Sequence, residues 1–233
     1  TEQHDGITVV RDDLHAGGTK ARFLLGLFRE HQEVVYASPA EGGAQSALAH
    51  CAHQTGRKAT IFVAKRKQLH PRTAAALQTG ATIHQVPHGY LTHVQSEARK
   101  YVEQTPGAYL LPFGANLDTA IQAIACAAAS IHPAPDEVWC AAGSGVLSRA
   151  LAEAWPRADR HAVQVGRALT DADVAGAKIH VHPLAFSQEA HTAPPFPSDR
   201  HYDAKAWQFC KMLSQPTKKR SVLFWNVAPQ PFA

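Results

Sequence analysis

Short apolar runs alternate with amphipathic stretches along most of the chain. The apolar runs have the length and composition of buried strands, and the stretches between them have the 3.6-residue spacing of helices. The predicted strands cover residues 7–10, 33–37, 59–64, 82–86, 109–111, 137–141, 162–165 and 221–225. The predicted helices cover 45–55, 72–78, 95–104, 117–130 and 146–154. This alternation predicts an α/β fold with a doubly wound parallel sheet and helices on both of its faces.

The length and hydrophobicity of the chain are consistent with this fold. A chain of 233 residues with 45% hydrophobic composition can bury one large core or two small ones. The alanine-rich stretch 120–131 is too short to cross a membrane and contains Gln122. The chain does not open on a basic segment followed by an apolar one, so we expect a cytoplasmic protein. The proline-rich stretch 192–197 predicts an ordered connector or a lid.

Cysteine and histidine spacing give little sign of a metal site. The four cysteines lie far apart without a Cys-x-x-Cys pair, so we expect buried free thiols: Cys51, Cys126, Cys140 and Cys210. His180 and His182 alternate and could face the same side of a strand. With no third ligand nearby, we expect no metal there.

Two basic clusters stand out in a chain of net charge +4. One covers residues 65–72 and the other residues 218–220. Clusters of this kind can contact the phosphates of a nucleic acid, with an affinity that depends on salt. They are also common in solvated loops, and both interpretations stay open.

Lys20 follows a pair of glycines, at the point where the apolar pattern of a helix begins. A lone lysine at such a junction suits covalent amine chemistry, because the protein can desolvate the amine and fix its direction. The alternative is a solvated lysine in the first turn of a helix.

A second glycine turn, Gly143-Ser144-Gly145, joins the predicted strand 137–141 to the helix 146–154. Such a turn lets backbone N–H groups point inward, and the helix dipole favours a phosphate at the N-terminus. The alternative is an ordinary tight turn.

These segments resemble, in order, the motifs of one enzyme family. The resemblance rests on Arg11-Asp12-Asp13-Leu14 with Gly17-Gly18-Thr19-Lys20, Gly42 to Ser46, Tyr109 to Gly114, Gly143 to Gly145, and Tyr202 to Ala206. The family is that of aminocyclopropane-carboxylate deaminase and D-cysteine desulfhydrase, which belongs to the tryptophan-synthase-β-like fold type II.

The resemblance implies pyridoxal 5'-phosphate as cofactor and an amino acid as substrate. Lys20 would carry the cofactor, and the phosphate would lie against Gly143, Ser144, Gly145, Val146 and Leu147. Ser46 would contact the substrate carboxylate, unless it only caps a helix. Tyr202 would lie over the active site as an acid–base or stacking residue, unless it only packs on the core. The resemblance also implies a homodimer and a smaller subdomain at about 37–112, inserted in the larger cofactor-binding part.

The chain departs from the family pattern at several positions. Ala47 and Leu48 replace an Asn-His pair whose asparagine holds the phenolic oxygen of the cofactor ring in relatives. Leu147 replaces a threonine, so Ser144 or Ser148 would have to supply that hydroxyl. After the predicted last strand, Asn226-Val227-Ala228-Pro229 replaces a polar His-Thr-Gly-Gly motif of relatives, and Asn226 is the candidate to face the ring nitrogen. The segment before the lysine motif is nearly absent, so we expect a trimmed member of the family.

The function that follows is a lyase acting at the α-carbon of an amino-acid group, by deamination, elimination or decarboxylation. Trimmed proteins of this kind are associated with bacteriophage pathways that decarboxylate an amino acid attached to thymidine in DNA. That alternative would place the protein in the host cytoplasm and in contact with nucleic acid. A pyridoxal-phosphate carrier without enzymatic activity is the third possibility.

Overall fold

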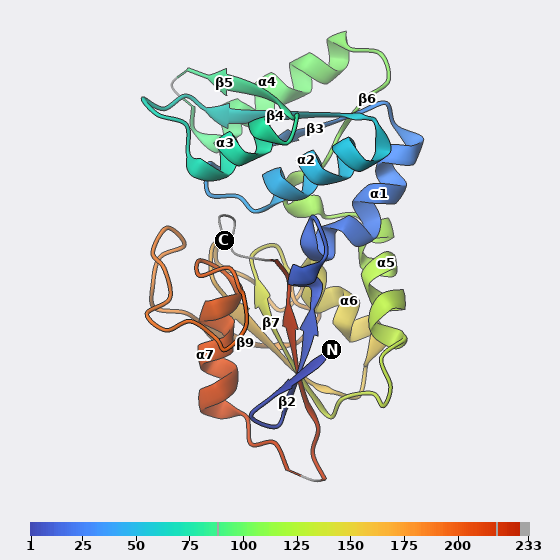
Figure 1. The fold of residues 1–233 in the computed structure, drawn as a ribbon, viewed down its shortest axis with the longest axis vertical. Coiled ribbons are helices and arrows are strands. Elements are labelled where there is room, and N and C mark those ends of the chain that lie inside the picture. Colours follow the sequence, from blue (N-terminus) through green and yellow to red (C-terminus); the bar gives the residue numbers. More distant parts are fainter. Residues whose placement is uncertain (88, 218, 229–233) are drawn as a thin grey trace. The chain divides into compact units, whose positions relative to one another are not determined.

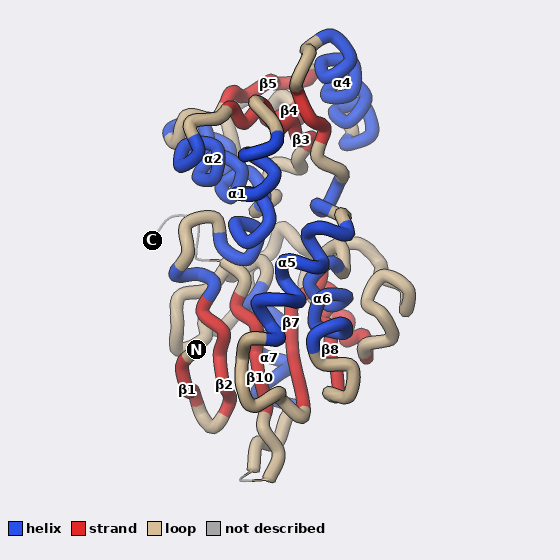
Figure 2. The backbone as a smooth tube through the Cα atoms, turned by 90° about the vertical axis from the view of Figure 1, so that its right-hand side faces the viewer, coloured by secondary structure: helices blue, strands red, loops and turns tan. Residues whose placement is uncertain are grey.

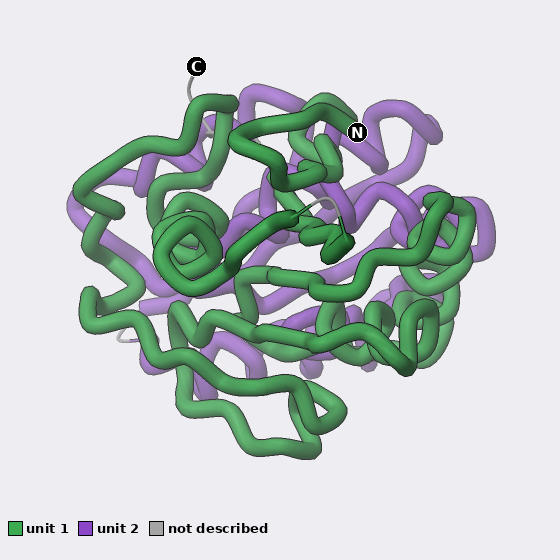
Figure 3. Tube along the Cα trace, turned by 90° about the horizontal axis from the view of Figure 1, so that it is seen from below, with its two compact units in different colours: residues 1–15, 116–233 green, residues 16–115 purple. Residues whose placement is uncertain are grey.

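A computed structural model describes residues 1–87, 89–217 and 219–228 of the chain. Lys218 of the second basic cluster and Pro229 of the altered C-terminal motif lie outside the described residues. The chain divides into two compact units, each built around its own sheet. Unit 1 contains Thr1–His15 and Asn116–Ala233, and unit 2 contains Ala16–Ala115 (Figure 3). Unit 2 includes the range 37–112 expected for a smaller subdomain, and that assignment stays a prediction.

The sheet of unit 1 has the strand order β1-β2-β10-β7-β8-β9 (Figure 1). Its strands are β1 (Glu2–His4), β2 (Ile7–Arg11), β7 (Glu137–Ala142), β8 (Asp159–Gln164), β9 (Lys178–Val181) and β10 (Val222–Asn226). All neighbours pair in parallel except β1, which pairs with β2 antiparallel. A two-residue turn, Asp5-Gly6, makes this hairpin, with both residues at positive φ.

Helices cover both faces of this sheet. Helix α5 (Asp118–Ala129) packs on α6 (Val146–Ala154), which contacts β7 and β8, while α7 (Asp203–Leu213) lies on the opposite face (Figure 2). A short 3-10 helix, η1 (Asp12–Leu14), follows β2. The core under α7 includes Trp139, Trp207 and Phe224. Phe196 of the proline-rich stretch packs on it, 5.0 Å from the ring centroid of Trp207, so this stretch is an ordered connector.

Unit 2 contains an all-parallel sheet of order β5-β4-β3-β6. Its strands are β3 (Glu33–Ala37), β4 (Lys58–Ala64), β5 (Thr82–Val86) and β6 (Ala108–Leu110). Its helices are η2 (Gly18–Lys20), α1 (Ala21–Glu30), α2 (Ala44–Thr55), α3 (Pro71–Gln78), α4 (Leu91–Gln104) and η3 (Phe113–Ala115). Helix α4 packs on β3, β4 and β6, and helices α1, α2 and α3 contact one another in sequence. Because α2 follows β3 and α3 follows β4, both helices begin at the carboxyl edge of this sheet.

The predicted α/β class is confirmed, and three details differ from expectation. The strands form two sheets, and β1 makes the first of them mixed. Cys126 is exposed, because it lies on the outer face of α5, whereas Cys51, Cys140 and Cys210 are buried free thiols. Among the described residues, the structure has no helix with the length and apolar character needed to span a membrane.

Candidate active site

The carboxyl edge of the unit 1 sheet collects most of the predicted cofactor contacts. Strands β2, β10 and β7 run parallel, and Trp225 of β10 pairs with both Val10 and Cys140. The residues that follow these strands therefore lie along one edge: Asp12 and Asp13 after β2, Asn226 at the end of β10, and Gly143 after β7. This edge is where open α/β sheets bind their ligands.

The turn between β7 and α6 requires glycine at its last position. Gly145 has φ +85°, and a β-carbon on it would lie 1.9 Å from the backbone oxygen of Asp173. The Asp173 segment is itself held in place, because Arg167 Nη2 lies 2.6 Å from Asp173 Oδ1. The same ion pair and the bonds from Thr170 hold the pKa of Asp173 well below its usual range. The glycine turn is thus braced from behind by the loop of Asp173, which the ion pair with Arg167 stabilises.

The first turn of α6 has no side-chain cap. The N–H groups at the start of a helix lack partners within the helix, and together with the dipole they favour an anion. The residues after the glycine turn, Val146 and Leu147, are buried, so this end of the helix presents backbone more than side chain. The arrangement fits a phosphate group.

The two serines that could replace the missing threonine hydroxyl lie in different surroundings. Ser148 is buried, and its hydroxyl donates to the backbone oxygen of Val174 at 2.9 Å. Ser144 is half-buried within the glycine turn itself.

Tyr202 lies directly on the glycine turn. Its hydroxyl accepts a hydrogen bond from the Gly143 N–H at 3.0 Å and donates to the backbone oxygen of Ala141 at 3.3 Å. A β-carbon on Gly143 would lie 3.4 Å from the tyrosine ring. Burial, with Asp203 nearby, raises the pKa of Tyr202 above its ordinary value. The phenol is therefore protonated, and its hydroxyl bonds to the backbone of both Ala141 and Gly143. This arrangement is suited to holding the turn in place.

Asn226 is fully buried and bonded on every side. Its Nδ2 donates to Asp13 Oδ1 at 2.7 Å and to the Pro197 backbone oxygen at 2.8 Å. Its Oδ1 accepts from the Ser198 hydroxyl at 2.9 Å. Arg11 in turn holds both oxygens of Asp13, at 2.8 and 2.7 Å. A contact between Asn226 and a ring nitrogen would require one of these bonds to be exchanged, and that role stays a prediction.

Lys205 provides a contrast to Lys20. It is fully buried near the start of α7, and its Nζ donates to the Ala185 backbone oxygen at 2.8 Å. Burial lowers the pKa of this lysine. The lysine of the Tyr202–Ala206 motif thus stabilises the loop that contains Ala185.

Lys20 occupies the junction predicted for it, at the end of η2 and directly before α1. The turn before it has Gly17 at φ +88°, and a β-carbon there would lie 3.4 Å from the α-carbon of Ala47. The lysine turn therefore packs closely on the first turns of α2, where Ser46 lies. Within unit 2 the structure brings the segments of Lys20 and Ser46 together.

Ser46 is not the N-cap of α2. The helix begins at Ala44 with Gly43 as its N-cap, so Ser46 lies in the first turn, half-buried. The preceding loop is held by Gln45, whose Nε2 donates to the backbone oxygens of Pro39 and Ala40, both at 3.0 Å. A half-buried hydroxyl beside uncapped helix amides is suited to binding a carboxylate.

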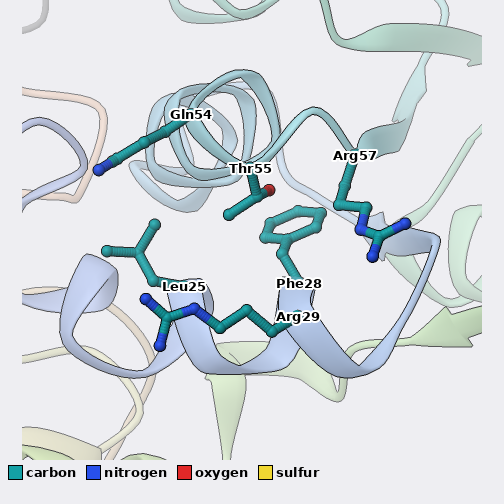
Figure 4. Close-up of a pocket in the computed structure, with 6 residues that line it drawn as sticks. All are labelled: Leu25, Phe28, Arg29, Gln54, Thr55 and Arg57. Atoms are coloured by element: carbon teal, nitrogen blue, oxygen red, sulfur yellow. The ribbon is translucent and has the colours of Figure 1, made fainter.

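A cavity of about 340 Å³ in unit 2 is separate from these residues (Figure 4). It lies between the C-terminal halves of α1 and α2, whereas Lys20 and Ser46 lie at the N-terminal ends of those helices. Its lining residues are Leu25, Phe28, Arg29, Gln54, Thr55 and Arg57.

The remaining candidates have structural partners. His180 bonds to His161, with their nitrogens 2.9 Å apart, and His182 Nε2 lies 3.2 Å from Gln208 Oε1. The described residues include no group of three side chains placed to hold a metal ion. Arg220 of the second basic cluster forms ion pairs with Glu137 and Asp159, at 2.9 and 2.5 Å.

Sequence reasoning missed three residues of these sites. Asp13 and Ser198 fix Asn226, and Arg72 lies beside the loop of Ser46. The paired aspartates after a strand were a signal for Asp13. Ser198 lies in a loop whose path the sequence pattern does not predict, and the position of Arg72 depends on how α3 packs against α2.

Comparisons with known proteins agree with this geometry. A family model described as "Pyridoxal-phosphate dependent enzyme" matches residues 2–211. No match was found among curated proteins. The fold is similar to that of an ACC deaminase homologue, with a TM-score of 0.79 and 16% identity over 94% of this chain and 83% of that one. Diaminopropionate ammonia lyase from Escherichia coli has a TM-score of 0.66 and 13% identity, over 96% and 78% of the two chains. A hydrogen sulfide-producing enzyme from Fusobacterium nucleatum has a TM-score of 0.66 and 11% identity, over 99% and 92%.

Proposed function

The chain belongs to the family of pyridoxal-phosphate-dependent enzymes, and we propose that it is a lyase acting at the α-carbon of an amino-acid group. The observation that carries the proposal is the uncapped first turn of α6 behind the braced glycine turn, which fits the cofactor phosphate. Solved structures of similar fold are named for a deaminase homologue, an ammonia lyase and a hydrogen sulfide-producing enzyme. Those names support bond cleavage on a small amino compound as the reaction class.

Each site residue has a role in this proposal. When bound, pyridoxal phosphate withdraws electrons from the α-carbon of the amino acid. Lys20 would hold the cofactor through its Nζ, and its amine would carry a proton to or from that carbon. Ser46 orients the carboxylate with its hydroxyl. Tyr202 fixes the glycine turn through Gly143, and the acid–base or stacking role expected from the resemblance stays a separate prediction.

The reaction is tested by comparing free and carried substrates. We expect poor turnover of free aminocyclopropane carboxylate and D-cysteine, because Ala47 and Leu48 remove side chains that relatives use beside the cofactor ring. Release of ammonia, keto acid or sulfide measures deamination and elimination, and release of carbon dioxide measures decarboxylation. Rapid turnover of either free compound would assign the protein to small-molecule metabolism.

A second candidate is decarboxylation of an amino acid attached to thymidine in phage DNA. Its support is the charge of unit 2, which has eleven lysines and arginines against five glutamates and no aspartate. Lys65, Arg66 and Lys67 are exposed and follow β4, at the same edge of the sheet as the Ser46 loop. Arg66 Nη2 lies 3.1 Å from Glu41 Oε1, so the basic segment is joined to that loop.

A gel shift with duplex DNA at two salt concentrations tests this candidate. The double variant K65Q/K67Q removes two exposed charges near the Ser46 loop, and R99Q/K100Q removes two from α4 as a matched control. Contact through the basic segment predicts weaker binding and a shallower salt dependence for the first variant only. Equal loss in both variants, or no binding at low salt, would contradict it.

A further inference from the structure

The cavity between the C-terminal halves of α1 and α2 combines an apolar floor with positive charge. Leu25 and Phe28 of α1 supply the apolar surface, and Thr55 closes it from α2. The charged members of the described lining are Arg29 and Arg57, and it includes no carboxylate. The volume of about 340 Å³ suits a small ligand, because ligand pockets typically pair apolar walls with a few polar groups.

Arg29 makes no hydrogen bond or ion pair through its side chain within the residues that the structure describes. It is exposed, in the last turn of α1. Figure 4 shows its side chain running back along α1, so that the guanidinium lies on the side of Leu25. Long side chains on a helix take this direction, toward the N-terminus. The charge is thus placed beside the apolar floor of the cavity.

Gln54 extends from α2 on the same side of the cavity as the guanidinium of Arg29 (Figure 4). Its amide is exposed and makes no side-chain hydrogen bond with another described residue. Two groups that donate hydrogen bonds, one of them charged, therefore flank Leu25 from the two helices.

Arg57 supplies a second positive charge, beyond the ring of Phe28 (Figure 4). Its Nη1 donates to Gln32 Oε1, a neutral partner that leaves the charge uncompensated. The exposed Glu30 at the end of α1 does not line the cavity. Two full charges outweigh the partial charges of about half a unit each at the C-terminal ends of α1 and α2. The cavity therefore favours an anion.

We propose that this cavity binds a small carboxylate that carries one aromatic ring. The ring packs on Leu25 and Phe28, and the carboxylate lies between Arg29 and Gln54. A guanidinium can donate two parallel hydrogen bonds to a carboxylate. An aromatic ring suits the floor because it stacks on phenylalanine and attracts a nearby arginine. The site shares no residue with those that we assign to the cofactor and the substrate.

Arginine side-chain NMR with benzoate as the probe tests this proposal. In full-length protein labelled with ¹⁵N-arginine, the Nε–Hε signals of Arg29 and Arg57 are those lost in R29K and R57K. Titration with benzoate at constant ionic strength should shift both signals with saturation. Benzamide lacks the charge and acetate lacks the ring, so each should bind at least about tenfold more weakly. Signals that ignore benzoate, or move no more than that of the exposed Arg99 on α4, overturn the proposal.

Variants of the exposed arginines give a second readout with little risk to folding. R29Q should weaken benzoate binding, followed through the Arg57 signal, about tenfold, the loss expected for a hydrogen bond to a charged group. R29K keeps the charge and should lose less. R99Q removes an exposed arginine from α4 and should bind benzoate like wild type. Equal affinities in R29Q and wild type would contradict the proposed place of the carboxylate.

Repeating the titration in protein loaded with pyridoxal phosphate separates this site from the substrate site. The Arg29 response to benzoate should be the same with and without the cofactor, because the two sites share no residue. A response that the cofactor abolishes would place benzoate at the Ser46 loop and contradict the proposal. A benzoate response in protein that never takes up the cofactor contradicts the proposed function and leaves this site standing.

Discussion

The Tyr202 hydroxyl lies 3.0 Å from the backbone nitrogen of Gly143 and accepts its hydrogen bond. Tyr202 immediately precedes α7, and Gly143 immediately follows β7. The contact therefore ties the start of a helix on one face of the sheet to the turn that we assign to the cofactor phosphate. Tyr202 acts on that turn even if it never touches the substrate.

Removing this hydroxyl should weaken cofactor binding. Y202F loses a bond worth about 1 kcal/mol, so the Kd for pyridoxal phosphate should rise about five- to tenfold. The pH profile of kcat should stay the same. Spectroscopic titration of the unloaded protein measures the first, and steady-state assays measure the second. A fall in kcat of about 100-fold or more at unchanged cofactor affinity would instead support the acid–base role.

The two glycines of the turn should respond differently to alanine. In G145A the new β-carbon collides with the Asp173 backbone and the positive φ is strained, so we expect a loss of several kcal/mol in the free energy of unfolding. In G143A the methyl group meets only the Tyr202 ring at contact distance, so the loss should stay below about 1 kcal/mol. Guanidinium denaturation measures both. Similar stabilities for the two variants would show that the loop of Asp173 moves to make room for the new methyl group.

Asn226 distinguishes a structural from a cofactor role. N226A breaks the bonds to Asp13 and Ser198 and leaves a buried carboxylate with fewer donors, so we expect about 2 kcal/mol of destabilisation. The absorption spectrum of bound cofactor should stay in place. A shifted spectrum with little change in stability would indicate that Asn226 reaches the ring nitrogen.

The stacked histidines His161 and His180 should make stability depend on pH. Burial, followed by the neighbouring His161, lowers the pKa of His180 to about 4, and burial also lowers that of His161. The unfolded chain, with histidine pKa values of about 6.5, then binds more protons than the folded protein between pH 6.5 and 4. The contribution of these histidines to the free energy of unfolding is therefore fully present above pH 6.5 and is lost as the pH falls toward 4.

Denaturation at pH 7 and pH 5 measures this effect. Between pH 7 and pH 5, H180F should lose on the order of 2 kcal/mol less free energy of unfolding than wild type, because it removes the histidine whose pKa is lowered most. H93Q, which changes an exposed histidine on α4, should behave like wild type. Parallel pH dependence in H180F and wild type would rule out His180 as the cause.

Buried strands and glycine-flanked helices could be predicted well from the sequence. The residue ranges of β3, β5 and α6 agree with the expected ones, because each has a continuous apolar pattern between clear turn signals. Strand β1 was missed, because residues 2–4 are polar and only the Asp5-Gly6 turn indicates the hairpin. Helix α4 begins four residues before its predicted start, at Leu91, because the exposed Thr92 and His93 interrupt the apolar pattern of its first turn.

For the candidate site, the sequence predicted which segments form it, but not which residues their side chains hydrogen-bond to. The glycine turn and the lysine junction follow from local chemistry, and the structure has both where they were expected. The partners of Tyr202 and Asn226 depend on chain crossings between distant strands, which periodicity does not encode. The same holds for Arg72, whose place beside Gly43 depends on the packing of α2 against α3.

The identity of the lysine that carries the cofactor tests the central claim most directly. Purified protein loaded with pyridoxal phosphate would be reduced with borohydride, digested and analysed by peptide mass spectrometry, with K20R as the control. We predict a single adduct on Lys20 that is absent in K20R. An adduct on the exposed Lys65 or the buried Lys205, or none after loading, would contradict the account.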